Sequence, residues 1–210
     1  MILLCAPSHD ETTEYTSKLF DNFPDLGSLT VLRKFKSPLT YDQLLSELSI
    51  DPETTQVTVI FCGHGEPGVL LGPGDHPGAP DYSETVSSFY EGSHVQLGPA
   101  RMLAFCCSSA VGLDDYFERT GGRTFVGFKD DIPLLLEDGD YANCWRGVLH
   151  KSASALLNAP DQPKLEKSVR KIYEGALALF PPEKDSVYEW GLWMRFCLQD
   201  QVDRIKCIKT

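Results

Sequence analysis

A histidine and a cysteine each follow a short apolar run that has the length and composition of a buried β-strand. The run 56–62 is followed by a Gly-His-Gly triplet centred on His64, and the run 101–106 is followed directly by Cys107. A thiolate is a strong nucleophile, and a nearby imidazole can take the thiol proton and later protonate a leaving amine. His64 and Cys107 therefore form a candidate catalytic pair for acyl transfer.

The two runs would bring this pair together if they are neighbouring strands of one sheet. Reactive groups gather beyond the carboxyl ends of such strands, which lie about 5 Å apart. Glycines beside His64 would allow close approach of a substrate, and the Gly65 and Cys107 amides would form an oxyanion hole worth about 3 kcal/mol per donor. We also expect Cys107 to lie near the start of the helix that follows its strand, where exposed amides favour a thiolate.

Apolar runs of strand length alternate with segments of helical period along the chain, which predicts an α/β fold. We expect a mostly parallel central sheet with helices on both faces. The expected strands are 2–5, 29–34, 57–62, 102–106 and 124–128, and the expected helices are roughly 9–23, 40–48, 82–90 and 111–119. The Gly- and Pro-rich segment 63–80 contains an apolar patch at 69–71, which predicts a small hairpin beside the sheet.

The chain of 210 residues is 42% hydrophobic and 23% charged, which suits one domain with one core. We expect a single domain over 1–210, with the sheet and the site in 1–155 and a helical part, 156–210, packed on it. Aromatic and aliphatic residues at helical spacing in the second half are expected to complete the core. They are Tyr141, Trp145, Val148, Trp190, Leu192, Trp193 and Phe196.

The net charge is −11, from 19 basic and 30 acidic residues, and this argues against direct binding to nucleic acids or membranes. The apolar start of the chain is too short for a secretory signal or a membrane span. Seven cysteines show neither a disulfide framework nor a C-x-x-C pair. We therefore expect a cytoplasmic protein without metal or cofactor, and we interpret His76 and His94 as surface residues.

Once these features are combined, the chain resembles the caspase-like cysteine peptidases, a clan that includes caspases, metacaspases, gingipains and bacterial CHAT domains. The segment 63–72, GHGEPGVLLG, is similar to their histidine loop and hairpin, and CSSA at 107–110 is similar to the CHAT cysteine motif. In caspases the histidine lies about 50 residues before the cysteine. His64 lies a comparable distance before Cys107 in this chain. The resemblance covers about residues 1–155 and implies a three-layer caspase-like fold.

The cysteine motif leaves a choice of nucleophile, because relatives have one cysteine after Ala or Ser and this chain has two in succession. Aligning Cys107 places a small residue before it, whereas aligning Cys106 places the bulky Phe105 there. We favour Cys107 and interpret Cys106 and Cys62 as buried neighbours. Because Phe105 stands where metacaspases have a pocket acid, their preference for Arg or Lys at P1 is not implied.

The resemblance also implies that the loop after the strand 124–128 contributes to the substrate pocket. Lys129, Asp130 and Asp131 are the candidate substrate-binding residues; the alternative is an ordinary solvated loop. The two acids would attract a basic P1 side chain, whereas Lys129 would oppose it. His9 lies at the same edge of the sheet, and we interpret it as the start of a helix beside Asp10.

The leading functional hypothesis is a cysteine endopeptidase that cleaves a protein substrate through a thioester. By family analogy it would act in a bacterial antiviral defence or regulated cell-death system, with a companion protein that activates it or is cut by it. The alternative is a catalytically inactive caspase-like scaffold or regulatory partner. A flavodoxin-like anion-binding domain would need a glycine loop after the first strand, and residues 6–9, Ala-Pro-Ser-His, do not supply one.

Overall fold

The computed structural model describes residues 2–6, 10–21, 23, 29–32, 51, 55–67, 69–71, 100–113, 117, 121–159, 161–182 and 190–208. Its strands are β1 (Ile2–Cys5), β2 (Leu29–Leu32), β3 (Thr58–Cys62), β4 (His64–Glu66), β5 (Val69–Leu71), β6 (Arg101–Phe105), β7 (Thr124–Phe128) and β8 (Ile205–Ile208). Its helices are α1 (Glu11–Leu19), α5 (Asp140–Asn158), α6 (Gln162–Leu177) and α7 (Gly191–Arg204).

Six of these strands form one sheet in the order β2-β1-β3-β6-β7-β8. All neighbours pair in parallel except β8, which runs antiparallel to β7 at the edge. The register of β3 and β6 places Cys62 opposite Phe105, so the two strands end level with each other. The residues that follow these strands therefore start from the same edge of the sheet.

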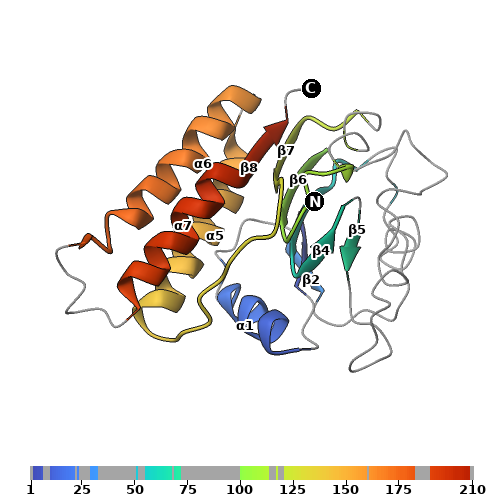
Figure 1. The fold of residues 1–210 in the computed structure, drawn as a ribbon. Helices are drawn as coiled ribbons and strands as arrows, with labels where there is room; N and C mark the ends of the chain where they lie inside the picture. The colour runs from blue at the N-terminus through green and yellow to red at the C-terminus, as the bar shows by residue number, and fades with distance from the viewer. Residues whose placement is uncertain are drawn as a thin grey trace.

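Both faces of the sheet are covered, which explains why its strands are continuous apolar runs. On one face Ile60, Phe105 and Phe128 pack against α1, α5, α6 and α7. Figure 1 shows α5, α6 and α7 side by side. On the other face the core includes Phe61, Leu113 and Phe117, and the last two lie in helical backbone. The predicted α/β class, with a mostly parallel sheet between helical layers, is confirmed.

Most predicted elements that fall on described residues are present. The strands 2–5 and 124–128 have the predicted bounds, and the hairpin at 69–71 is formed by β4 and β5. The first helix is shorter than expected because it begins after Asp10, which caps it. The predicted helices 40–48 and 82–90, and His76 and His94, lie outside the described residues, as does His9.

The C-terminal segment differs from its prediction in two ways. It was expected to be helical throughout, but the described chain ends in β8 because Ile205 to Ile208 pair with β7. Trp145 and Val148 are buried as expected, whereas the expectation of a buried aromatic cluster near α7 is wrong. The exposed fractions are 44% for Trp190, 63% for Leu192, 49% for Trp193 and 51% for Phe196.

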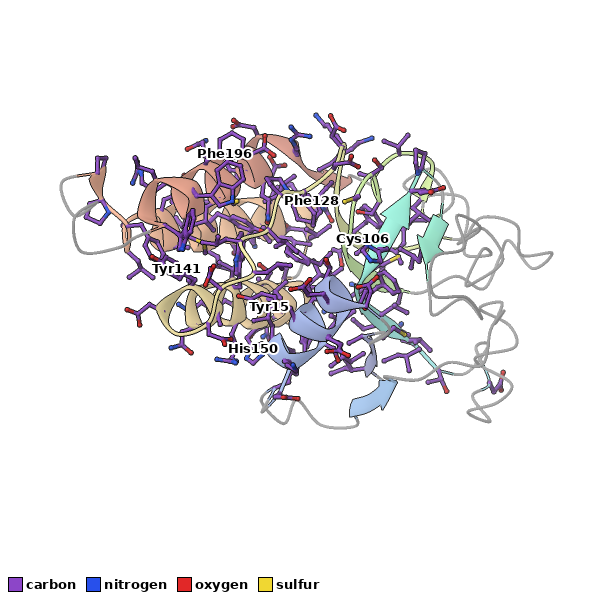
Figure 2. All side chains as sticks on the ribbon, turned by 60° about the horizontal axis from the view of Figure 1, so that its bottom comes forward. Tyr15, Cys106, Phe128, Tyr141, His150 and Phe196 are labelled. Atoms are coloured by element: carbon purple, nitrogen blue, oxygen red, sulfur yellow. The ribbon has the colours of Figure 1, made fainter. Side chains whose placement is uncertain are left out.

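The reason for this exposure is the orientation of α7. The helix turns Met194, Cys197, Leu198 and Gln201 into the core, so the face with Phe196 points outward (Figure 2). Trp193 and Phe196 stack on each other there, with ring centroids 5.1 Å apart. None of the described helices is both long enough and apolar enough to cross a bilayer.

Candidate functional site

His64 stands directly beyond β3, at the start of the β4–β5 hairpin. The Gly63 amide donates to the Phe105 carbonyl at 3.3 Å, which continues the pairing of β3 with β6 past the end of the strand. The His64 ring then meets a carboxylate, because its Nε2 lies 2.6 Å from Oδ2 of Asp10. Both side chains are about one-third exposed, at 32% and 34%, so the pair can be reached from solvent.

Asp10 uses its two carboxylate oxygens for two purposes. Oδ1 accepts from the Thr13 amide at 2.8 Å and so caps α1, while Oδ2 faces His64. The Thr13 hydroxyl accepts in return from the Asp10 amide at 3.0 Å, which completes a capping box. Partial burial acts to raise the pKa of Asp10, but the hydrogen bonds from Thr13 and His64 outweigh it and hold the pKa below its usual range.

Sequence reasoning missed Asp10 as a site residue, although two signals were available. Asp10 follows β1, which pairs in parallel with β3, so the two strands deliver their next residues to the same edge. An aspartate three residues before a threonine is also a helix-start pattern. The pattern predicts the cap correctly, but it does not reveal that one oxygen remains for a neighbouring histidine.

Gly65 brings the histidine loop into direct contact with the cysteine turn. A Cβ atom on Gly65 would lie 2.6 Å from Cys106 Sγ and 2.6 Å from the Cys107 carbonyl oxygen, closer than real Cβ atoms approach. Only a residue without a side chain fits this close approach. The structure thus brings Gly65 against the Cys107 backbone, and His64 is the preceding residue in the chain. The pairing of the His64 ring with the Cys107 sulfur stays a prediction.

The turn after β6 presents two adjacent thiols in different ways. Cys106 is completely buried beside β4 (Figure 2), whereas Cys107 is partly exposed. Ser108 follows with a φ of 49°, a left-handed conformation that residues with a Cβ rarely adopt. The turn is fixed by Ser109, whose Oγ lies 2.9 Å from the Ala104 carbonyl and accepts from the Phe128 amide at 3.0 Å.

The acidities of the thiols follow their surroundings. Burial raises the pKa of Cys106 far above its usual value and that of Cys62 to about 12, so both behave as neutral core residues. Burial also raises the pKa of Cys107, and the Asp131 carboxylate raises it further. The Ile132 amide, 3.5 Å from Cys107 Sγ, acts in the opposite direction and lowers this pKa.

One expectation about Cys107 is therefore wrong. The thiol was expected to lie at a helix start that favours the thiolate, but helical backbone is first reached at Leu113, after the turn and a bend. Among the described residues no helix begins at or directly after Cys107, and burial is the largest cause of its raised pKa. The raised pKa favours the neutral thiol of Cys107 over the thiolate.

The loop with Lys129, Asp130 and Asp131 lies against the cysteine turn. The Ser108 amide donates to the Asp130 carbonyl at 3.0 Å. Arg204, at the end of α7, pairs with the Asp130 carboxylate at 3.1 Å and donates to the Asp131 carbonyl at 2.9 Å. All three loop side chains are exposed, and Asp131 is the one that acts on the thiol.

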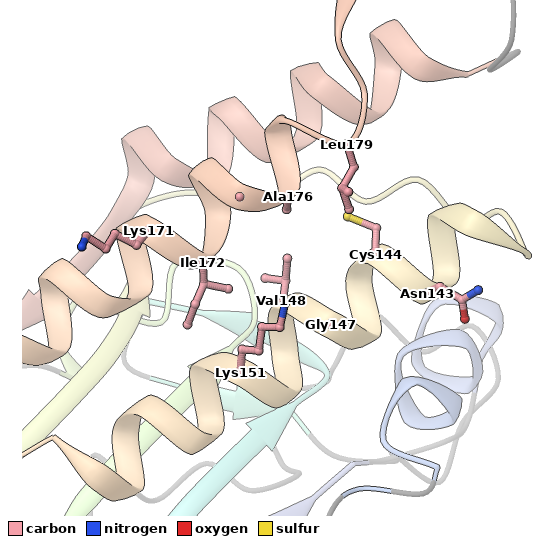
Figure 3. Close-up of a pocket in the computed structure, with 10 residues that line it drawn as sticks. Asn143, Cys144, Gly147, Val148, Lys151, Lys171, Ile172, Ala176 and Leu179 are labelled. Atoms are coloured by element: carbon pink, nitrogen blue, oxygen red, sulfur yellow. The ribbon is translucent and has the colours of Figure 1, made fainter. Parts of the chain in front are cut away.

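Neither a metal centre nor a helical groove takes in the predicted site residues that the structure describes. No group of three His, Cys, Asp or Glu side chains among the described residues is arranged to hold a metal ion. A groove of about 380 Å³ lies between α5 and α6 (Figure 3), with Cys144, Gly147, Lys151 and Lys171 among its lining residues. None of the predicted site residues lines this groove, so the candidate site remains the edge of the sheet.

Comparison with known proteins gives one structural likeness. No protein-family model matches the sequence, and no curated protein matches it. A solved structure of a secreted C11 cysteine protease from Bacteroides thetaiotaomicron, in complex with an irreversible peptide inhibitor, is similar at a TM-score of 0.44 and 13% identity. The match covers 83% of this chain and 58% of the other. At this distance the likeness concerns chain arrangement and assigns no activity.

Proposed function

We propose that this protein is a cysteine peptidase in which Cys107 is the nucleophile and His64 is the general base. The observation that supports this most is the 2.6 Å contact between Asp10 and His64, on a loop whose next residue packs against the Cys107 backbone. A nucleophile, a base and an acid that orients the base thus stand at one edge of the sheet. This order of groups is what activation of a weak nucleophile requires.

The Asp10 contact determines how His64 would work. A carboxylate only accepts hydrogen bonds, so Nε2 carries the ring proton and the lone pair of the neutral imidazole is on Nδ1. Nδ1 is then the atom that takes and returns the proton during catalysis. Asp10 stabilises the imidazolium that forms, because the positive ring faces the carboxylate at close range.

The proposed reaction has two halves. In the first, Nδ1 of His64 takes the Cys107 proton while the sulfur bonds to the carbonyl carbon of the substrate peptide. The tetrahedral intermediate then expels the amine, which receives the proton from His64, and a thioester remains on Cys107. In the second half His64 takes a proton from water, the hydroxide oxygen bonds to the thioester carbon, and the thiol leaves with the proton.

The oxyanion of each intermediate would be stabilised by the amides of Gly65 and Cys107. Gly65 touches the Cys107 carbonyl, so the two residues adjoin one reacting centre. Within the described part of the chain, no backbone carbonyl accepts from the Cys107 amide. Each such donor lowers the barrier by about 3 kcal/mol when it points at the developing charge.

The substrate would be a protein segment whose P1 side chain reaches the loop 129–131. The Asp130 carboxylate is already paired with Arg204, so Asp131 is the acid we assign to P1, with a basic side chain as its partner. Lys129 contributes its backbone, since its amide donates to the Arg204 carbonyl at 3.0 Å. We propose that it acts in a reducing cytoplasm, in agreement with the free thiols of six of its seven cysteines: Cys5, Cys62, Cys106, Cys107, Cys144 and Cys197.

The biological setting is proposed on family resemblance alone. We propose that a companion protein activates the peptidase or is its substrate, in a bacterial defence or regulated cell-death system. The competing proposal is a scaffold of the same fold without activity. It draws support from the raised pKa of Cys107, because a thiol held neutral is a poor nucleophile until a base acts on it.

The decisive experiment combines a peptide library, an electrophilic peptide probe for thiols and three variants. We expect Cys107→Ala to abolish labelling and cleavage, and His64→Ala to slow both by about 1,000-fold. Cys106→Ala is the matched control, because it removes the adjacent sulfur but should keep labelling at Cys107 by peptide mass spectrometry. Labelling that survives Cys107→Ala and is lost in Cys106→Ala would reverse the nucleophile assignment. Cleavage that none of the variants affects would favour the scaffold.

A further inference from the structure

The segment 129–139, which joins β7 to α5 and is called the strap below, is held by side chains from outside it. Four of its carbonyl groups accept hydrogen bonds from three different helices. The pairs are Asp131 with Arg204 at 2.9 Å, Pro133 with Gln201 at 2.7 Å, Leu135 with Trp145 at 3.2 Å and Glu137 with Tyr15 at 2.8 Å. A segment without helix or strand thus has a defined position.

Gln201 makes the shortest of these four contacts and is fully buried. Its Oε1 accepts from the Tyr173 hydroxyl at 3.0 Å, while its Nε2 donates to the Pro133 carbonyl. Because a carbonyl can only accept, the amide must point its nitrogen at Pro133 and its oxygen at Tyr173. The Pro133 carbonyl therefore sets the orientation of the Gln201 amide, and the Tyr173 hydroxyl on α6 supports that orientation by donating to Oε1. Gln201 on α7 in turn fixes the strap.

Pro133, whose carbonyl is held by Gln201, is the neighbour in the chain of the residue that contacts the proposed nucleophile. Ile132 precedes Pro133, and its amide donates to Cys107 Sγ at 3.5 Å. The proline ring restricts its own φ and limits the conformations of the residue before it, so the two residues move together. A bond that holds the Pro133 carbonyl consequently also holds the Ile132 amide against the sulfur.

We propose that Gln201 is a positioning residue for Cys107, which acts through Pro133 and keeps the Ile132 amide as a donor to the thiolate. The role of this donor in peptide cleavage rests on the proposed function, but its effect on the thiol does not. Gln201 has no charge, so it can influence the sulfur only through position. The charged group that acts on Cys107 is the Asp131 carboxylate on the strap, and the backbone carbonyl of Asp131 accepts from Arg204. On the neighbouring loop Gly65, the residue after His64, contacts the cysteine turn.

The test is the rate at which iodoacetamide alkylates Cys107 between pH 6 and pH 10, followed by peptide mass spectrometry. In Gln201→Leu the Pro133 carbonyl loses its donor and the Ile132 amide moves away, so the pKa of Cys107 rises. A lost bond to a charged group reduces the thiolate fraction, and the greater nucleophilicity of a more basic thiolate offsets part of the loss. The expected net effect at pH 7 is alkylation about three- to tenfold slower.

Two further variants make the result interpretable. Gln199→Leu is the matched control on the same helix, because Gln199 is exposed and its side chain donates to Asp203 at 3.3 Å rather than to the strap. The alkylation profile of Gln199→Leu should equal that of the wild type. Tyr173→Phe removes the orienting hydroxyl but leaves Gln201 in place, and should shift the profile the same way by a smaller amount. If circular dichroism shows that Gln201→Leu does not fold, the alkylation profile of Tyr173→Phe provides the test instead.

A folded Gln201→Leu or Tyr173→Phe protein with the wild-type alkylation profile would overturn the proposal. The same is true if Gln199→Leu shifts the profile as much as Gln201→Leu. A shifted profile in a protein that cleaves no peptide would support the positioning role and contradict the peptidase proposal. The two inferences therefore fail separately.

Discussion

The two halves of the candidate site are held by different kinds of interaction. On the histidine side one charged contact, Asp10 to His64 at 2.6 Å, orients the ring, and the same carboxylate anchors the start of α1. On the cysteine side no ion pair touches the sulfur in the described residues. Cys107 is placed by a buried turn, by the Ile132 amide and by the strap behind it.

The difference separates preparation of the base from preparation of the nucleophile. Asp10 orients the His64 ring before any substrate arrives, whereas burial raises the pKa of Cys107 and so favours its neutral form. A thiol in this state is protected from oxidation and unspecific alkylation, because both reactions need the thiolate. Activation then depends on the contact between the halves, and Gly65 is the residue at that contact.

The largest effect is expected from Gly65→Ala, which breaks the contact itself. The new methyl group would stand 2.6 Å from both Cys106 Sγ and the Cys107 carbonyl, so the turn must move. Such overpacking costs about 1–3 kcal/mol of unfolding free energy, and a displaced nucleophile lowers the rate by about 100-fold or more. Chemical denaturation and kcat/KM for a cleaved peptide measure the two effects.

Gly147→Ala provides the matched control for this change. Gly147 lies inside α5, and a Cβ there would meet nothing within 4 Å. Replacement of an interior helical glycine should stabilise the protein by about 0.5–1 kcal/mol and leave the rate unchanged. A Gly65→Ala protein that behaves like Gly147→Ala would mean that the two halves do not touch in solution.

The second-largest effect is expected from a change at Asp10, which alters only the histidine side of the site. Asp10→Asn keeps an oxygen to cap α1, but its amide NH2 faces His64 and forces the ring proton onto Nδ1, where the base is needed. We expect kcat to fall by about 10- to 100-fold, together with a modest loss of unfolding free energy at neutral pH because the charged contact with His64 is gone. Asp161→Asn is the control, because Asp161 caps α6 through the Lys164 amide at 2.9 Å. Equal kcat values for the two variants would contradict the role of Asp10.

The pH dependence of the unfolding free energy should report on Asp10. The pKa of Asp10 is lower in the folded than in the unfolded chain, so its contribution to stability is present above the unfolded pKa. It is lost as the pH falls through the lower, folded pKa. Asp10→Asn has no carboxylate to protonate, so it does not lose this stability at low pH. The difference in unfolding free energy between the variant and the wild type should therefore shrink on acidification.

Whether the sequence predicts a feature of the fold or the site depends on how far apart along the chain the interacting residues lie. The strands before His64 and Cys107 are continuous apolar runs, and the structure confirms that these strands are parallel neighbours. Gly65 was singled out because it belongs to the same triplet as His64. These features depend on residues close in the chain, and patterning reports such features well.

Interactions between distant segments were not readable. Asp10 meets His64 across a parallel strand pair, and Gln201 reaches Pro133 from a helix near the end of the chain. The pairing of β8 with β7 also joins distant segments, and its short run followed a helical pattern without a break. The raised pKa of Cys107 depends on how deeply the turn is buried, which motif spacing does not specify.

The smallest effect is expected from Asp131→Asn, which tests the cysteine side without moving it. The Asp131 carboxylate raises the pKa of Cys107, so its neutralisation should lower that pKa and speed alkylation at pH 7 by about two- to threefold. Cleavage after basic P1 residues should fall in the same variant, since the acid assigned to P1 is gone. Asp130→Asn is the adjacent control, because its carboxylate faces Arg204. If Asp131 binds the substrate, Asp131→Asn should alkylate faster but cleave more slowly. If Asp131 only suppresses the thiol, the same substitution should raise both rates.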